Sequence, residues 1–124
     1  MTASVRYIVN DATSATAFYR DQLGFEVLIE AGPGFAMLQR DDLRLLLNAP
    51  GAGGGGQGDG THPPEPGGWN RISLSVNDVR EEAARLEEAG VTLRSPVIEG
   101  NAGNQVLVAD PSGNLVELME LRQG

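Results

Sequence analysis

Hydrophobic and polar residues follow the same order in the two halves of the chain. Each half begins with an alternating segment typical of a strand, at 4–9 and at 71–76, and each segment runs into the triplet Val-Asn-Asp. A stretch with helical spacing comes next and stops at Gly24 in the first half and at Gly90 in the second, where a left-handed residue would end a helix. This pattern predicts an internal repeat at the level of the fold.

Three more strands are predicted after each helix. They cover residues 25–29, 35–39 and 43–47 in the first half, and 91–94, 105–109 and 115–119 in the second. The last two strands of each half should form a hairpin, and Pro111 and Gly113 suit a type I turn followed by a left-handed residue. Asp78 and Glu81 have the spacing of a helix N-cap and its reciprocal partner.

Alternation along the first strand of each half predicts one apolar face and one more polar face. The apolar positions are Val5, Tyr7, Val9, Ile72, Leu74 and Val76. The helix residues expected to pack against a sheet are Ala17, Phe18, Leu23, Val79, Ala83, Leu86 and Ala89. The opposite strand positions are Ser4, Arg6, Ile8, Arg71, Ser73 and Ser75. With helices on one side only, the two sheets could curl so that these opposite faces line a shared cleft.

Residues 51–67 stand apart because they include eight Gly and three Pro. This composition cannot bury enough apolar surface to offset the entropy lost on ordering. We expect a mobile linker that joins a first module at 4–50 to a second at 68–122 within one domain; a lid over a ligand site is the alternative. His62 lies in this segment, and we expect it to be a solvated loop residue unless the fold orders it beside a serine.

Composition excludes several kinds of chemistry. The 124 residues include 17 acidic and 9 basic ones, and the net charge of −8 disfavours nucleic acid and anionic membranes while weakly favouring a cationic ligand. The chain has no Cys, all its basic residues are Arg, and His62 is its one His, which excludes thiolate, Schiff-base and multi-His metal chemistry within one chain. We expect a cytoplasmic protein, because no apolar run could span a bilayer and no signal peptide is recognisable.

Two motifs resemble one known family. Ala17-Phe18-Tyr19 is followed by Leu23-Gly24-Phe25, and the second half closes with Asp110-Pro111-Ser112-Gly113-Asn114-Leu115-Val116-Glu117-Leu118. Together they resemble the vicinal oxygen chelate superfamily, which includes glyoxalase I, extradiol dioxygenases, and fosfomycin resistance and bleomycin-binding proteins. The similarity runs from about Val5 to Leu121. It implies an α+β fold in which two tandem βαβββ modules form a cupped mixed sheet, and it implies a homodimer.

The resemblance also implies where a metal ion would bind. Metal-dependent members place ligands at four points, which fall here near Ser4, Leu45, Arg71 and Glu117. Residues 45–47 are all Leu and Arg71 is a permanent cation, so only Glu117 could act as a ligand. One carboxylate beside a guanidinium does not provide the three or four N/O donors that a transition metal needs. We therefore expect no metal and no other cofactor.

Several residues could instead contact a ligand in the predicted cleft. Arg71 and Glu117 would form either a structural ion pair or a polar anchor for a ligand. Trp69 would either cover an edge of the core or provide a stacking platform for a planar or cationic ligand. An apolar wall for the ligand could be formed by Phe35, Met37, Leu45, Leu47 and Met119, although apolar residues at strand spacing more often belong to the core. Asn70 and Gln105 could provide neutral hydrogen-bond partners, and Arg6 is a further candidate.

Three functions remain open at this point. The first is a non-catalytic protein, close in character to metal-free drug-binding members, that sequesters an antibiotic or another aromatic or cationic natural product at a dimer interface. The second is a glyoxalase-like lyase or isomerase, or a dioxygenase, with a non-standard or absent metal site. The third is a regulatory or scaffold subunit without a ligand. We expect a small molecule and a second copy of the chain as partners, and neither nucleic acid nor membrane.

Overall fold

The computed structural model describes residues 3–121, which form two compact units that divide between Gly67 and Gly68. Each unit contains one helix and one four-stranded sheet with parallel and antiparallel neighbours. The predicted α+β class with two tandem modules is confirmed. Residues 51–67 group with the first unit, and the predicted end of the second module at residue 122 lies outside the described residues. Within residues 3–121, no helix is long and apolar enough to cross a membrane.

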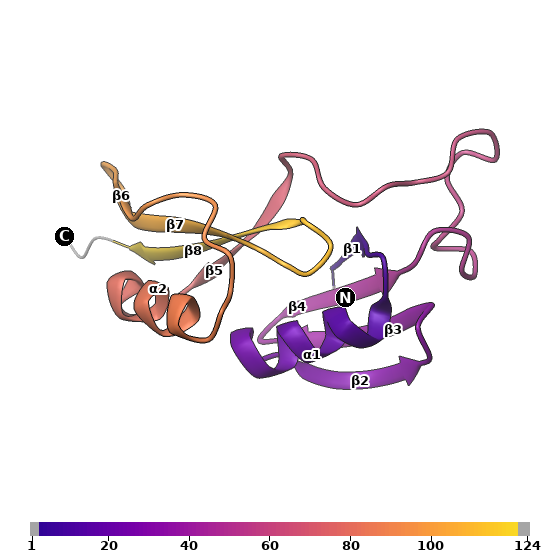
Figure 1. Cartoon of the computed structure of the whole chain (residues 1–124), viewed down its shortest axis with the longest axis horizontal. Helices are drawn as coiled ribbons and strands as arrows, with labels where there is room; N and C mark the ends of the chain where they lie inside the picture. The colour runs from indigo at the N-terminus through magenta and orange to yellow at the C-terminus, as the bar shows by residue number, and fades with distance from the viewer. Residues whose placement is uncertain (1–2, 122–124) are drawn as a thin grey trace. The chain divides into compact units, whose positions relative to one another are not determined.

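The first unit follows the predicted order of one strand, one helix and three strands. Its elements are β1 (Ser4–Ile8), α1 (Ala12–Leu23), β2 (Glu26–Ala31), β3 (Phe35–Arg40) and β4 (Leu43–Asn48). The strand order is β1-β4-β3-β2, with β1 parallel to β4 and the other neighbours antiparallel. Helix α1 contacts β2, β3 and β4, and Figure 1 shows it along one side of the sheet.

The second unit repeats this topology with one very short strand. Its elements are β5 (Arg71–Ser75), α2 (Val79–Glu88), β6 (Ile98–Glu99), β7 (Gly103–Ala109) and β8 (Leu115–Leu121). The strand order is β5-β8-β7-β6, and β5 is parallel to β8 (Figure 1). Both predicted hairpins are confirmed. In the second, Gly113 donates its N–H to the carbonyl of Asp110 at 3.0 Å and has a φ of 87°, as the turn motif predicts.

The strand predicted at 91–94 is not present. This stretch forms an isolated bridge between Leu93 and Val108, flanked by backbone bonds from Arg94 N to Leu107 O at 2.7 Å and from Ala109 N to Thr92 O at 3.0 Å. The next residues explain why the ladder stops: the N–H of Leu107 is bonded by the side chain of Ser95 at 3.0 Å, and Pro96 has no N–H to donate. The edge strand β6 therefore forms later in the chain than predicted.

The helices bury stripes that the sequence predicts only in part. Along α1 the buried residues are Ala12, Ala15, Thr16, Tyr19 and Leu23, so Leu23 is confirmed, whereas Ala17 and Phe18 are only half-buried. Tyr19 takes the central position and packs edge to face against Phe18 and Phe25. Along α2 the predicted Val79, Ala83 and Leu86 are buried, but Ala89 is exposed because the helix has already ended there.

The helix ends agree with the predicted caps, except that within residues 3–121 the Glu81 side chain does not make the predicted reciprocal bond. Asp11 accepts a hydrogen bond from Ser14 N, and Asp78 accepts bonds from Arg80 N and Glu81 N, each at 3.1 Å. Gly24 and Gly90 have φ values of 73° and 86°, in the left-handed region that ends a helix. The first N–H of α2, at Val79, is bonded by the carboxylate of Glu120 at 2.8 Å, which ties the helix to β8.

Burial alternates along the strands, so each sheet has a helix-covered face and an opposite face. On the helix-covered faces Tyr7, Val9, Ile72 and Leu74 are buried as predicted. The strand register then defines the opposite sides. The first open face consists of Ser4, Arg6, Ile8, Phe35, Met37, Gln39, Arg44, Leu46 and Asn48. The second open face includes Arg71, Ser73, Ser75, Gln105, Leu107, Glu117 and Met119, and at one end of it the register adds Ala109 and the buried Leu115.

Candidate functional site

A polar cluster lies on the second open face, on the two parallel strands β5 and β8. Arg71 donates from Nε to Glu117 Oε1 at 3.1 Å, and Ser73 donates from its hydroxyl to Glu117 Oε2 at 2.7 Å. The carboxylate is mostly covered, since the Glu117 side chain is only 12% exposed, whereas that of Arg71 is 31% exposed. The predicted pairing of Arg71 with Glu117 is therefore observed, and the two hydrogen bonds hold the carboxylate in place.

Neutral side chains flank this cluster. The register pairs Gln105 with Met119 and Met119 with Ser75, and it places Leu107 beside Glu117. Gln105, Leu107 and Met119 are half-buried, so each presents part of its surface. The second open face thus combines an ion pair with a thioether, an aliphatic chain and an amide.

The first open face has a related polar pair. Arg6 donates from Nε to Asn48 Oδ1 at 2.9 Å, and Asn48 in turn donates from Nδ2 to the carbonyl of Ala52 at 3.2 Å. Asn48 is buried, with 3% of its surface exposed. Beside this pair the register places the half-buried Phe35 next to Asn48, and Met37 next to Leu46. The first open face therefore also combines guanidinium groups with apolar side chains.

The first part of the Gly/Pro-rich segment packs against this pair, a contact that the prediction of a mobile linker did not include. Residues 51–57 form backbone bonds that include Gly51 N to Gly56 O at 2.7 Å and Gly56 N to Ala52 O at 2.9 Å. A Cβ at Gly55 would lie 2.6 Å from Asn48 Oδ1 and 2.7 Å from Arg6 Nε. The segment is held by backbone hydrogen bonds and close backbone approach instead of apolar burial, which is why its composition did not reveal the contact.

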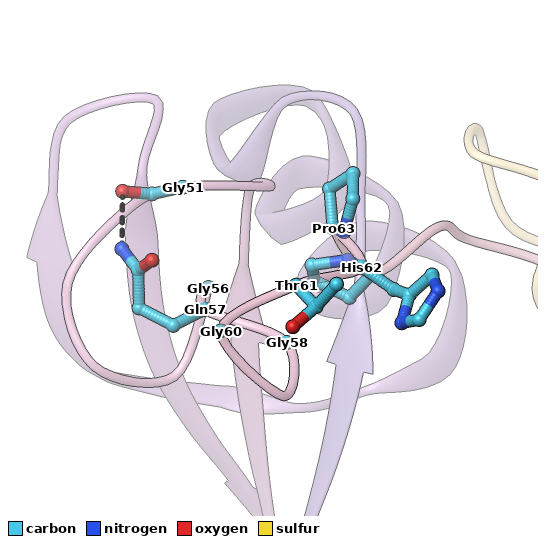
Figure 2. A pocket seen from close by; sticks show the side chains of 9 residues that line it. Gly51, Gly56, Gln57, Gly58, Gly60, Thr61, His62 and Pro63 are labelled. Atoms are coloured by element: carbon cyan, nitrogen blue, oxygen red, sulfur yellow. Dashed lines mark hydrogen bonds between the residues drawn. The ribbon is translucent and has the colours of Figure 1, made fainter.

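The same segment forms a shallow pocket of about 220 Å³ near His62. Figure 2 shows Gln57 bonded to Gly51 on one side of the pocket and the His62 ring directed away on the other.

Nδ1 of His62 lies 3.0 Å from Asp59 Oδ2, and this contact, with the backbone N–H groups of His62 and Thr61, lowers the pKa of Asp59 to about 2. The His62 side chain is 81% exposed, so it is a solvated loop residue as predicted.

Four predicted candidates lie away from the open faces. Leu45 and Leu47 have no exposed surface and belong to the core on the helix-covered face, so the prediction that they form a ligand wall is corrected. Trp69 and Asn70 precede β5, and Trp69 is 74% exposed, so it does not cover a core edge in this structure. Its role as a stacking platform remains a prediction.

The residues of the open faces that the sequence does not predict include Gln39, Arg44, Leu46, Asn48 and Leu107. It does predict the face of Ser73, but the bond of Ser73 to Glu117 follows from the register, which puts the two residues side by side on neighbouring parallel strands. Leu46 and Asn48 alternate with Leu45 and Leu47 and so lie on the opposite side of β4. Three successive Leu residues give no alternation from which to assign these faces, and the pairing of β4 with β1 and β3 assigns them.

The donor set does not fit the metal site that the resemblance implies. Of the four matching positions, Leu45 is enclosed in the core and Arg71 provides a cation. Glu117 is the one ligand type among them, and both of its oxygens already accept hydrogen bonds. Within residues 3–121, no group of three or more His, Asp or Glu side chains is placed to hold a metal ion.

Solved structures with the same fold cover nearly the whole chain. A superfamily member from Sphaerobacter thermophilus is 28% identical, with a TM-score of 0.77 over 97% of this chain and 96% of that one. TnmS3, an antibiotic binding protein from Streptomyces sp. CB03234, is 26% identical, with a TM-score of 0.74 over 98% and 96%. A lactoylglutathione lyase from Agrobacterium tumefaciens, at 24% identity and a TM-score of 0.75 over 97% and 92%, shares the fold.

A family model agrees with these structures and with the two repeated units. It matches residues 2–118, which include the first sheet, the second sheet up to the middle of β8, and the cluster around Glu117. The chain therefore belongs to the Glyoxalase/Bleomycin resistance protein/Dioxygenase superfamily.

Proposed function

We propose that this chain is a non-catalytic small-molecule binding protein that sequesters an antibiotic or another natural product. The observation that carries the proposal is the state of Glu117, the one carboxylate at the positions where the superfamily resemblance implies metal ligands. Arg71 and Ser73 bond both of its oxygens, so the group serves as part of a fixed polar surface. A fixed polar surface beside apolar side chains orients a ligand without providing a Lewis acid.

The composition of the open faces supports binding. Gln105 and Met119 lie beside the Arg71–Glu117 pair. On the other sheet Phe35 and Met37 lie on the same face as Arg6, one strand beyond Asn48 and Leu46. Met side chains adapt to irregular apolar shapes, and the guanidinium groups and the amide provide orienting hydrogen bonds. TnmS3, at 26% identity, is described as antibiotic binding, which supports the same class of ligand here.

Three finer parts of the proposal rest on the sequence. A homodimer, a ligand cleft at its interface and a cytoplasmic location are expected from the superfamily resemblance and from the composition. We propose Trp69 and Asn70 as ligand contacts on the same basis, since both are exposed and precede β5 directly. Size-exclusion chromatography with light scattering would test the dimer: a single-chain mass at micromolar concentration would remove it.

Enzymatic turnover is the competing function, because the superfamily also includes lyases and dioxygenases. Purified full-length protein should be titrated with bleomycin and a panel of DNA-damaging antibiotics by calorimetry. We expect saturable binding of at least one compound, which mass spectrometry then recovers unchanged. Parallel assays for lactoylglutathione turnover and for oxygen consumption, with added Zn²⁺, Ni²⁺, Mn²⁺ or Fe²⁺, should show no activity; metal-dependent turnover that a chelator abolishes would replace this proposal with an enzyme.

A further inference from the structure

Arg71 uses one edge of its guanidinium and leaves the other available. Nε donates to Glu117, while Nη1 and Nη2 make no hydrogen bond to any residue within 3–121. The two Nη atoms carry N–H donors in one plane, a geometry that matches a carboxylate or another planar oxygen acceptor. Because the Arg71 side chain is 31% exposed, these donors are accessible on the second open face.

The carboxylate of Glu117 is poorly placed to attract a cationic ligand. Its two oxygens already accept bonds from Arg71 and Ser73, and its side chain is mostly covered. A ligand ammonium group approaching this face would meet the guanidinium of Arg71 first. Like charges in partly desolvated surroundings repel, so the local chemistry favours an acceptor over a cation.

The first open face shows the same preference independently. Arg6 also donates only from Nε, to Asn48, and Arg44 has a buried Nε with no hydrogen-bond partner within residues 3–121. Glu26, on the edge strand β2, is paired with Gln39 and is the acidic strand residue on the first open face. Much of the chain's negative charge instead lies on or beside the helices, at Asp11, Asp21, Asp78, Glu81, Glu82, Glu87 and Glu88.

We infer that Arg71 determines ligand specificity by donating from its two Nη atoms to a planar oxygen acceptor, a carboxylate being the best match, on an otherwise apolar or aromatic ligand. This inference rests on the proposed binding function and names the class of ligand. It differs from the cationic ligand that the net charge of −8 favours, because the charges next to the site outweigh distant charges screened by salt. Met119 and Leu107 beside the cluster would contact the apolar part of the ligand.

Matched aromatic probes test the inference on the unmodified protein. Naphthoate carries a carboxylate, acetylnaphthalene a neutral carbonyl, and naphthylmethylammonium a cation on the same ring system. Proton–nitrogen correlation spectra during titration should show saturable shifts at the amides of Ser73 and Glu117 with naphthoate, weaker ones with acetylnaphthalene and none with the ammonium. Tighter binding of the ammonium at these amides, or no saturable shift with naphthoate, would overturn the inference.

Variants then assign the effect to the Nη donors. Arg71→Gln should weaken naphthoate binding by about tenfold to a hundredfold, the usual effect of losing a charge-assisted hydrogen bond. Arg71→Lys keeps the charge but removes the planar pair of donors, so it should also weaken naphthoate binding. Arg20→Gln, which removes an ion-paired guanidinium from α1, is the control and should leave binding unchanged.

The outcome is separable from that of the proposed function. A protein that binds an antibiotic in the calorimetric screen but prefers the ammonium probe keeps the proposed function and loses this inference. Wild-type affinity for naphthoate in folded Arg71→Lys would equally exclude the bidentate contact. Thermal midpoints recorded for every variant identify any loss of binding that comes from unfolding.

Discussion

Arg71 and Glu117 are 46 positions apart in the chain, yet Nε of one lies 3.1 Å from Oε1 of the other. The parallel pairing of β5 with β8 produces this contact, since the register aligns Ser73 with Glu117 and leaves Arg71 diagonal to it. The three side chains therefore bridge the first and last strands of the second unit. The cluster has a structural role as well as the proposed role in binding.

Replacing Glu117 by Gln should destabilise the protein by about 1–2 kcal/mol, because one carboxylate that accepts from two donors becomes an amide that accepts through a single oxygen. Urea denaturation measures the change in unfolding free energy. Glu99→Gln is the matched control, since Glu99 pairs with Arg80 at the surface with 68% of its side chain exposed, and exposed pairs contribute little. If the two substitutions lower the unfolding free energy equally, the Glu117 cluster contributes no more to stability than an exposed ion pair.

Gly55→Ala and Gly54→Ala form a second matched pair. A Cβ at Gly55 would press on Asn48 and Arg6, whereas a Cβ at Gly54 would meet nothing within 4 Å. We expect Gly55→Ala to cost about 1–3 kcal/mol by displacing the loop or the Arg6–Asn48 bond, and Gly54→Ala to be neutral or slightly stabilising. Chemical denaturation of both variants gives the comparison. If Gly55→Ala leaves the unfolding free energy unchanged, Gly55 does not contact Arg6 and Asn48 in solution.

The repeat and the hairpins could be predicted because alternation, turn residues and glycines at helix ends are local signals. Strand faces were harder where alternation is absent. Residues 45–47 are all Leu, so the sequence alone does not show which of them faces the helix. The pairing of β4 with β1 and β3 decides it, and that pairing joins residues far apart in the chain.

The sequence predicts the charged pair of the candidate site but not the contacts that support it. Arg71 and Glu117 stood at positions that the resemblance singled out, whereas the hydroxyl of Ser73 acquires its partner only through the register of two distant strands. The contact of Gly55 with Arg6 and Asn48 has no side-chain signature at all. A composition rich in glycine indicates conformational freedom and says nothing about where backbone hydrogen bonds will fix the chain.

Leu45 and Leu46 test the corrected assignment of faces. Leu45 has no exposed surface, and Leu45→Ala should therefore cost about 2–5 kcal/mol through lost burial and the cavity left behind. Leu46 is half-buried on the first open face, so Leu46→Ala should cost about 1 kcal/mol or less. Thermal and urea unfolding of the two variants provide the measurement. A larger loss from Leu46 would reverse the faces of β4.

The pKa of Asp59, measured by titration, tests whether the turn at residues 59–62 forms in solution. Its carboxyl should titrate near 2 instead of 3.8, mainly because His62 bonds it through the side chain, and backbone N–H groups add to the effect. A folded-state pKa below the unfolded value means that the carboxylate stabilises the folded loop above about pH 4 and loses this contribution as the pH falls through about 2. The carboxyl carbon shift, followed by NMR against pH, gives the midpoint.

His62→Gln separates the side-chain contribution to this pKa from the backbone contribution. The variant removes the ring contact but retains the backbone N–H groups of residues 61 and 62, so the midpoint of Asp59 should rise only part of the way toward 3.8. Asp21, whose pKa Arg20 lowers on α1, serves as the internal control and should titrate alike in both proteins. If Asp59 titrates at its ordinary value in the unmodified chain, the turn at 59–62 is not formed in solution, and the pocket beside it would not persist.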